Sequence, residues 1–329
     1  MIDSVYKQKI NSAYAESTKN AFRNQCAAYI NFCNAHKLVL FPPSPSTVAR
    51  YLTMVTLKVA SYGTMANKLS VLSKFYNICG YSLNIHHPTI ELLMKACKRD
   101  MSVSARPKAP IEPSHLILIM HLLEYEKPLH RLFFTALIIQ FFSCVRKSNL
   151  LPPSLKAFSP FKHLTRGDFH FSQDAVILTF PWSKTLQNKN DVITLPIADI
   201  PGAIINPVQV YKQFIMDFPL PSSKMPAFAY VAAGSLVVLT QQAYIDLLKD
   251  YLRRLNLPAD AYSSHSIRRG GTTTLFRSGA SMQMIKAHGG WSSDCYRRYI
   301  AVHHNDKLQC TRKMVSYINF NYGDNQLSG

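Results

Sequence analysis

The sequence has few acidic residues for its size. Only 18 Asp and Glu stand against 37 Lys and Arg, which gives a formal net charge of +19 and a pI near 9.7. Because like charges repel, such an excess adds nothing to the stability of a fold, but it attracts a polyanion. The charge therefore indicates nucleic acid as the first candidate partner and an anionic membrane surface as the second; a basic protein with no special partner is the third interpretation.

The sequence also lacks a disulfide framework, a signal peptide and a membrane span. Its seven cysteines are odd in number, form no CxxC pair and lie mostly in apolar stretches, as free cysteines do in a reducing compartment. The N-terminus has no apolar signal core. The most apolar run, Leu132 to Phe142, is too short to cross a bilayer and fits a buried helix. These absences predict a soluble intracellular protein that is not secreted.

Motifs for metal and nucleotide chemistry are absent too. The twelve histidines include no HExxH motif, the carboxylates form no cluster of the kind that two-metal nucleases use, and there is no P-loop. We therefore expect neither a metal nor a cofactor.

The chain is long enough for two domains, and 47% of its residues are apolar. Residues 1–100 have a helical period throughout and predict a small all-α domain. Residues 101–113 contain three prolines and no helical period, so they are predicted to be an interdomain linker. Residues 114–329 are predicted to form a larger domain.

The first hundred residues are expected to contain four helices. Their predicted starts are Ser17 or Thr18, Ser46, a residue near Thr64, and Pro88. Their polar faces are basic, which suits a clamp on DNA as well as an ordinary solvated surface. The basic residues are Lys19, Arg23, Lys58, Lys68, Lys74, Lys95, Lys98 and Arg99.

The larger domain is predicted to combine helices with a small antiparallel β-sheet. Two β-like runs, Ala175 to Pro181 and Val192 to Pro196, flank a polar segment and predict a hairpin. A first helix is expected to be capped by Ser114. The remaining helical segments are Leu129 to Leu150, Pro207 to Phe218, Thr240 to Leu255, Ser266 to Arg277 and Ser281 to Ala287, with a further helix expected at Asp306 to Phe320. The predicted fold is therefore mainly α with a small antiparallel β-sheet.

Two basic residues of this domain stand out by their position. Arg146 directly follows the long apolar helix, where a charge is costly unless it meets an anion or a carboxylate. A structural salt bridge is the plainer interpretation for Arg146. Lys184 lies at the tip of the predicted hairpin, and there the plainer interpretation is a solvated lysine.

Two further segments add groups that can bind phosphate. In HSIRRGG, His265 and Arg268 lie three residues apart and share one face of a predicted helix start. A helix N-terminus with His and Arg favours an anion. In GGWSSDCYRRYI, residues 289–300, Trp291 and Tyr299 are close in sequence to two arginines.

Taken together, these segments resemble the active-site order of the tyrosine recombinases, the group of lambda integrase and Cre: Arg, Lys, His-x-x-Arg, Trp or His, Tyr. The likeness covers nearly the whole chain. It implies an all-α core-binding domain that clamps DNA, followed by an α+β catalytic domain with a C-terminal helix. The segment most similar to the recombinases of eukaryotic mobile elements of the Crypton and DIRS kind is HSIRRGGTTTLFRSGASMQMIKAHGGWSSDCYRRYI.

The resemblance also implies a role for each residue. Tyr299 is the expected nucleophile. Arg146 and Arg268 are expected to clamp the phosphate oxygens and to favour the phenolate of Tyr299. Lys184 is expected to protonate the leaving 5′ oxygen, and His265 to give a hydrogen bond or help take the tyrosine proton. Trp291 is expected to pack and orient. The implied catalytic set is Arg146, Lys184, His265, Arg268, Trp291 and Tyr299.

The sequence departs from the bacterial members at two points. They commonly have a carboxylate three residues after the first arginine, where this chain has Asn149. The spacing from Trp291 to Tyr299 is eight residues, one fewer than is common in bacterial members and similar to the eukaryotic elements. Tyr296 is the second candidate for the nucleophile.

The sequence therefore predicts a site-specific DNA recombinase or transposon integrase that works through a 3′-phosphotyrosine. The alternatives are strand relaxation like that of a type IB topoisomerase, and a catalytically inactive DNA-binding protein derived from a recombinase. The expected partners are double-stranded DNA and further copies of the chain, in dimers and tetramers on paired sites. A nuclear location is expected if the source is eukaryotic.

Overall fold

The structure, a computed structural model, describes residues 16–58, 61–101, 108–181, 193–291 and 293–300. The chain divides into two compact units, residues 1–107 and 108–329. Each unit builds a hydrophobic core of its own, as separate domains do.

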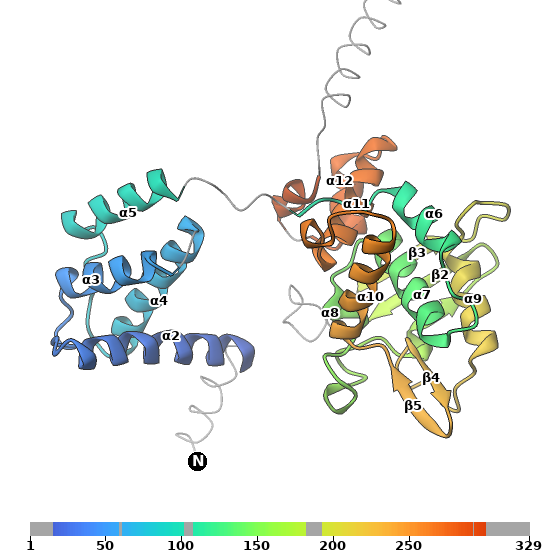
Figure 1. Cartoon of the computed structure of the whole chain (residues 1–329), viewed down its shortest axis with the longest axis horizontal. Helices are drawn as coiled ribbons and strands as arrows, with labels where there is room; N and C mark the ends of the chain where they lie inside the picture. The colour runs from blue at the N-terminus through green and yellow to red at the C-terminus, as the bar shows by residue number, and fades with distance from the viewer. Residues whose placement is uncertain (1–15, 59–60, 102–107, 182–192, 292, 301–329) are drawn as a thin grey trace, which may run out of the picture. The chain divides into compact units, whose positions relative to one another are not determined.

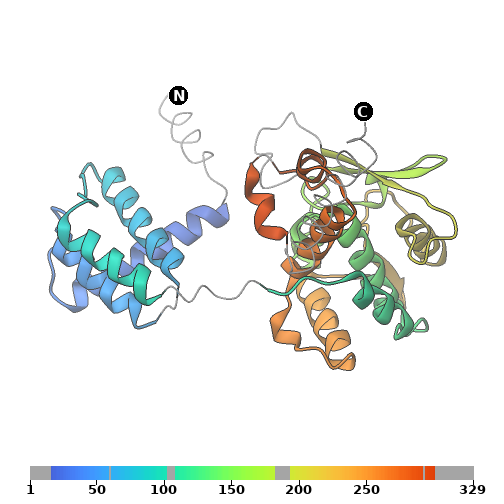
Figure 2. The ribbon, with the colours of Figure 1, turned by 90° about the horizontal axis from the view of Figure 1, so that it is seen from above.

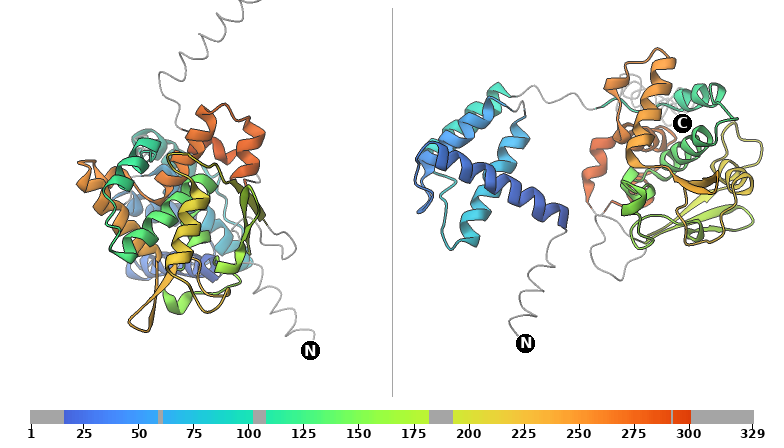
Figure 3. Two further views of the ribbon diagram at one scale, coloured as in Figure 1. Left: turned by 90° about the vertical axis from the view of Figure 1, so that its right-hand side faces the viewer. Right: turned by 60° about the horizontal axis from the view of Figure 1, so that its bottom comes forward.

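In its described part the first unit is a bundle of four helices (Figure 1). They are α2 (Glu16–Ala35), α3 (Pro45–Thr56), α4 (Tyr62–Ile78) and α5 (Pro88–Asp100). Figure 3 shows α2 crossing α4, while α3 packs against both α4 and α5. The predicted start of the last helix at Pro88 is confirmed.

The centre of this bundle is aromatic. Tyr29 of α2 meets Tyr51 of α3 edge to face, with 5.0 Å between the ring centroids. The hydroxyl of Tyr29 lies 2.8 Å from that of Tyr76, which donates to the carbonyl of Leu40. The buried hydroxyls of Tyr29 and Tyr76 are thus hydrogen-bonded to each other and to the backbone, as burial of polar groups requires.

Two helices of the first unit start earlier than the sequence predicted. α2 already begins at Glu16, so Ser17 and Thr18 lie inside its first turn and do not cap it. α3 begins at Pro45, one residue before the predicted start. Its cap is Ser44, and proline suits the first helical position because the N–H that it lacks would have had no partner there.

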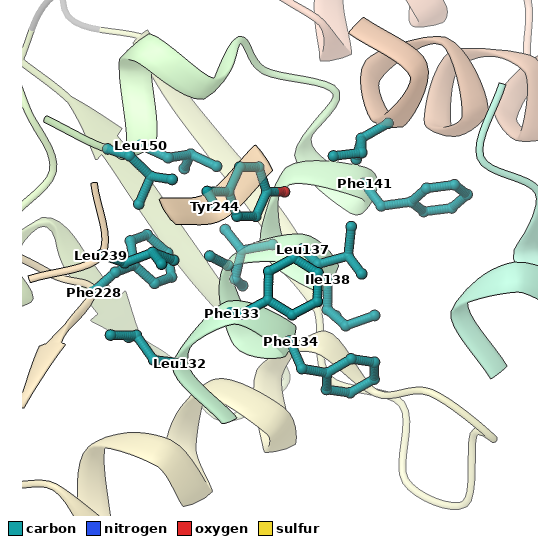
Figure 4. Packing of buried hydrophobic residues seen from close by; sticks show 14 of the residues in the cluster. Leu132, Phe133, Phe134, Leu137, Ile138, Phe141, Leu150, Phe228, Leu239 and Tyr244 are labelled. Carbon is teal, nitrogen blue, oxygen red and sulfur yellow. The ribbon is translucent and has the colours of Figure 1, made fainter. Parts of the chain in front are cut away.

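The second unit surrounds one buried helix, α7 (Pro128–Ser143). Figure 4 shows Phe133, Phe134 and Phe141 of α7 with Leu239 and Tyr244 packed around them. The other helices of this unit are α6 (Pro113–His121), α8 (Lys147–Leu150), α9 (Pro207–Asp217), α10 (Gln241–Arg254), α11 (Ser264–Arg277) and α12 (Met282–His288).

The sequence prediction is wrong in part for two helices of this unit. The helix capped by Ser114 in the prediction begins instead at Pro113, with Glu112 as its cap. The single long helix predicted from Leu129 to Leu150 is broken, because Cys144 adopts a left-handed conformation with φ 52°. A residue in this conformation ends a helix, and the following residues turn away before α8 starts.

Two small antiparallel sheets complete the unit. The first has the strand order β1–β2–β3, from β1 (Phe169–Phe171), β2 (Ala175–Phe180) and β3 (Ile193–Ala198). It forms one side of the unit (Figure 2). The hairpin of β2 and β3 was predicted, whereas β1 was not. The second sheet, β4 (Ala229–Ala232) with β5 (Ser235–Val238), was not predicted either.

The fold is mainly helical with small antiparallel sheets, as the sequence predicted. None of the described helices combines the length and the apolarity that crossing a membrane requires. The helix predicted for residues 306–320 lies outside the described residues.

Candidate active site

Arg146 owes its position to the break after α7. Cys144 turns the backbone, Val145 follows, and Arg146 then caps the short helix α8. The turn is held from inside by Gln140, whose side-chain amide donates to the carbonyl of Val145 at 3.1 Å. Arg146 is therefore presented, partly exposed, at the end of the most deeply buried helix of the unit.

His265 and Arg268 come from the first turns of α11. This helix begins at Ser264, two residues earlier than predicted, because Ser263 accepts a hydrogen bond from the backbone N–H of His265 and forms a capping box. His265 keeps only part of its surface exposed, whereas Arg268, one turn later, is only 2% exposed. The two residues share one face, as their spacing predicted.

Two glycines bring α11 unusually close to its neighbours. A Cβ atom on Gly270 would overlap the carbonyl oxygen of Ile111, and one on Gly271 would overlap that of Phe141. Phe141 lies in the last turn of α7, just before the turn to Arg146. The glycine pair after Arg268 therefore allows the helix with the second arginine to pack directly on the helix end that presents the first.

The guanidinium of Arg268 contacts two neighbouring aromatic rings. Its central carbon is 4.1 Å from the ring centroid of Trp291 and 5.1 Å from that of Tyr299. One terminal nitrogen donates to the carbonyl of Gly289 at 3.1 Å, while Nε is buried without a partner. Cation–π contacts and one backbone bond thus orient the group and leave donors free for a ligand.

Trp291 is buried at 5% exposure beside this guanidinium, and its indole N–H has no partner. Gly289 is required for this position, because a Cβ atom there would overlap the indole ring. The Gly289-Gly290 pair that precedes the tryptophan in sequence is therefore explained by packing at Gly289 and by a positive φ of 61° at Gly290.

Tyr299 ends a short 3₁₀ helix, Asp294–Tyr299, which the sequence had not predicted. Its ring centroid is 5.6 Å from that of Trp291 and 6.5 Å from that of His265. Thr273 of α11 donates to its carbonyl at 3.3 Å and so fixes the backbone at this residue. Tyr299 is partly exposed.

Tyr296, the second candidate nucleophile, differs from Tyr299 in its surroundings. It is 2% exposed and packs against Trp291 with 6.0 Å between ring centroids. It belongs to a small cluster with Cys144 and Ile285. Tyr296 therefore packs beneath the site through its contact with Trp291, whereas Tyr299 is accessible to a ligand.

The electrostatics of this cluster of residues favour an anion. Burial, followed by the positive charge of Arg146, lowers the pKa of Arg268 to about 10. Partial burial, followed by the positive charges of Arg268, Arg146 and Lys147, lowers the pKa of His265. Among the described residues no carboxylate forms an ion pair with Arg146 or Arg268. Two repelling arginines without a carboxylate call for a bound anion.

Two of the residues picked from the sequence, Lys184 and Asn149, differ from the rest in where they lie. Lys184 lies outside the described residues, in the segment between β2 and β3. Asn149, three residues after Arg146, is buried in α8 at 6% exposure. Of the six predicted catalytic residues, the structure therefore brings five close to one another.

Sequence reasoning missed the groups that hold the candidate site together. They are Gln140, Thr273 and the carbonyl group of Gly289. No motif marks Gln140 or Thr273. Gly289 was visible in sequence as half of a glycine pair, although its contact with Arg268 was not. Within the part of the chain that the structure describes, no three His, Cys, Asp or Glu side chains come close enough to hold a metal ion.

The basic residues of the first unit lie mostly at its surface. Arg23, Lys58 and Lys95 are exposed, as are Lys98 and Arg99 at the end of α5. Lys19, Lys68 and Lys74 are partly buried. Lys19 and Arg23 form ion pairs with Glu16, so part of the charge of α2 is compensated locally.

No family model matches the chain. The chain is 24% identical over 277 residues to an integrase/recombinase XerD homolog of Selenomonas ruminantium, covering 82% of this chain and 76% of that protein.

Solved structures of low sequence identity have the same fold. The Tn1549 transposon integrase in complex with transposon right end DNA has a TM-score of 0.61 at 14% identity, over 94% of this chain and 98% of that one. The XerH recombinase in a post-cleavage complex with a palindromic difH substrate has a TM-score of 0.57 at 14% identity, over 84% and 73%. A lambda integrase dimer bound to a COC′ core site has a TM-score of 0.56 at 13% identity, over 91% and 94%.

Proposed function

We propose that this chain, a tyrosine recombinase by its fold and by its sequence relative, cuts and rejoins DNA through a covalent bond to Tyr299. One observation carries the assignment of the site. Arg146 and Arg268 approach each other with no carboxylate partner among the described residues, and the ring of Tyr299 lies against the second guanidinium. A phosphodiester is the anion that fits such a pair, because two guanidinium groups can bind its non-bridging oxygens.

The chemistry follows from the position of each group. The Tyr299 oxygen attacks phosphorus and forms a new P–O bond, while the bond from phosphorus to the 5′ oxygen breaks. Arg146 and Arg268 stabilise the charge that develops on the non-bridging oxygens, and the free indole N–H of Trp291 is available to the same oxygens. The product is a 3′-phosphotyrosine with a free 5′-hydroxyl.

Proton transfer accompanies this displacement. The tyrosine proton must leave, and His265 is suited to accept it because its lowered pKa keeps the ring neutral at pH 7. The 5′ oxygen gains a proton, and we assign its donation to Lys184 on the strength of the family resemblance. When a 5′-hydroxyl attacks the phosphotyrosine, each step runs in reverse and the strand is sealed without an external energy source.

Three finer features complete the proposal. The spacing from Trp291 to Tyr299 and the amino-acid sequence around His265 support an origin in a eukaryotic mobile element of the Crypton or DIRS kind, and with it a nuclear location. The exposed basic residues of the first unit support its role as a DNA clamp. Exchange between two DNA sites requires two cleavages on each, which supports assembly of four copies.

A trapping assay tests the proposal. The protein is incubated with a nicked duplex that carries candidate element ends, in EDTA, and covalent adducts are separated on a denaturing gel. The wild-type protein is expected to form an adduct, and Tyr299→Phe to bind the DNA without forming one. Tyr296→Phe is the matched control, because it removes only a hydroxyl from a buried ring.

Each other outcome has a defined meaning. An adduct that persists in Tyr299→Phe and vanishes in Tyr296→Phe would reassign the nucleophile. Binding of the correct site without any adduct would leave a DNA-binding protein derived from a recombinase. Relaxation of supercoiled plasmid that lacks the element ends, by a protein that stays monomeric, would indicate a topoisomerase.

A further inference from the structure

The last residue of α12, His288, has no part in the proposed chemistry, yet it contacts the backbone at the start of the turn that leads to Arg146. Its Nε2 lies 2.7 Å from the carbonyl oxygen of Phe142. Because a carbonyl oxygen has no proton to give, Nε2 must carry the N–H and donate. Phe142 is the penultimate residue of α7, and the last carbonyls of a helix have no partner within the helix. His288 therefore caps the end of α7 from outside.

The turn that His288 caps is the one that presents Arg146. Between Phe142 and Arg146 the chain passes through the left-handed residue Cys144. On the inner side the turn is held by Gln140, which bonds to the carbonyl of Val145 and is itself bonded to the hydroxyl of Tyr244 at 2.7 Å. On the outer side it is held by His288.

The residue that follows His288 holds the other arginine. The carbonyl of Gly289 accepts a hydrogen bond from Arg268 at 3.1 Å. Two successive residues at the end of α12 thus connect to the two arginines, His288 through the backbone of α7 and Gly289 directly. A shift of α12 relative to α7 would change the distance between the two guanidinium groups.

We propose that His288 is a positioning residue, which keeps the turn of Arg146 in register with Arg268 so that both can bind one phosphate. It acts through the carbonyl of Phe142 and has no contact with the reacting atoms. This inference rests on the proposed DNA cleavage at the same site. It requires only one property of the side chain, an N–H donor at the place of Nε2.

Side-chain replacements can separate this donor from the rest of the ring. The amide nitrogen of glutamine reaches about as far from the backbone as Nε2, so His288→Gln keeps the donor. His288→Leu keeps the bulk and removes the donor. His288→Asn keeps an amide but places it too close to the backbone, so it is expected to behave like leucine. Gln283→Leu, an exposed position on the same helix, is the matched control.

The test compares cleavage with binding for these variants on the nicked duplex. The rate of adduct formation at saturating protein is expected to fall about tenfold in His288→Leu and His288→Asn, since a lost orienting hydrogen bond and a misplaced group have costs of that order. The Kd for DNA is expected to stay within twofold of the wild-type value. His288→Gln and Gln283→Leu are expected to cleave at about the wild-type rate.

Three results would overturn the inference. They are a wild-type cleavage rate in His288→Leu, equal losses in the glutamine and leucine variants, and a loss of cleavage that is matched by a loss of DNA binding. Thermal unfolding of each variant confirms that it is folded, and the asparagine and glutamine pair decides the question if leucine prevents folding. Failure of the wild-type protein to form any adduct would refute the proposed cleavage itself and not the role of His288.

Discussion

Replacing Gly271 by alanine tests the close contact between α11 and α7 on which the site depends. The new Cβ atom would lie 2.9 Å from the sulfur of Cys144 and nearer still to the carbonyl oxygen of Phe141. The oxygen is a backbone atom and Cys144 is fully buried, so the helices must move apart. Overpacking of this kind costs typically about 1–3 kcal/mol.

An opposing effect has to be subtracted. Glycine in the interior of a helix is less favourable than alanine by about 1 kcal/mol, so the substitution also relieves α11 of a poor helix former. The backbone overlap lies at the upper end of the overpacking range, and we expect a net loss of about 2 kcal/mol in the free energy of unfolding. We also expect slower cleavage, because moving the two helices apart would shift both arginines. Arg268 lies one turn before Gly271, and Arg146 lies two residues after Cys144.

Urea unfolding followed by tryptophan fluorescence is the appropriate assay. Both tryptophans of the chain, Trp182 and Trp291, lie in the second unit, so the signal reports that unit. Gly63→Ala is the control, read by circular dichroism. Its Cβ would meet only the Ser61 hydroxyl at 3.6 Å, and it is expected to be neutral or slightly stabilising. A Gly271→Ala protein as stable as the wild type would refute the packing argument.

Three further predictions concern the charges of the site. Arg268→Lys is expected to slow adduct formation by about a hundredfold or more, because a lysine cannot both keep the contacts of the guanidinium with the two rings and bind the phosphate with two donors. A rate within threefold of the wild type in single-turnover cleavage would contradict this. In the folded protein the pKa of His265 is lowered, so the contribution of His265 to stability is present above about pH 6.5 and is lost as the pH falls through the folded pKa. Between about pH 7 and 5 the His265→Gln variant should therefore lose less stability than the wild type. Parallel curves of unfolding free energy against pH for the two proteins would contradict this prediction. DNA affinity is expected to fall on the order of a thousandfold between about 50 and 200 mM salt, and a slope near zero in a fluorescence titration would exclude the proposed clamp.

The elements that sequence reasoning predicted well carry their own start signals. Asn206, Thr240 and Ser281 each cap a helix whose apolar period is regular, and these helices lie within a residue or two of their predicted bounds. The break at Cys144 could not be predicted, because a left-handed cysteine has no propensity signal and is imposed by tertiary contacts. The strands β1, β4 and β5 were missed because three or four residues are too few to show a period.

The candidate site divides in the same way. The motifs, through their resemblance to those of the tyrosine recombinases, were enough to select Arg146, His265, Arg268, Trp291 and Tyr299, which the structure brings together. The hydrogen bonds that hold these residues in place could not be predicted. Gln140, Thr273 and His288 donate to backbone carbonyl groups, and most of these groups are distant in sequence. Such bonds depend on the tertiary structure alone.

The most direct test of the account is to identify the amino acid that becomes bound to DNA. The adduct formed in EDTA is digested with protease and nuclease, and the modified peptide is sequenced by mass spectrometry. The account predicts a single 3′-phosphotyrosine at Tyr299. A phosphotyrosine at another position, or cleavage that leaves no covalent intermediate, would contradict it.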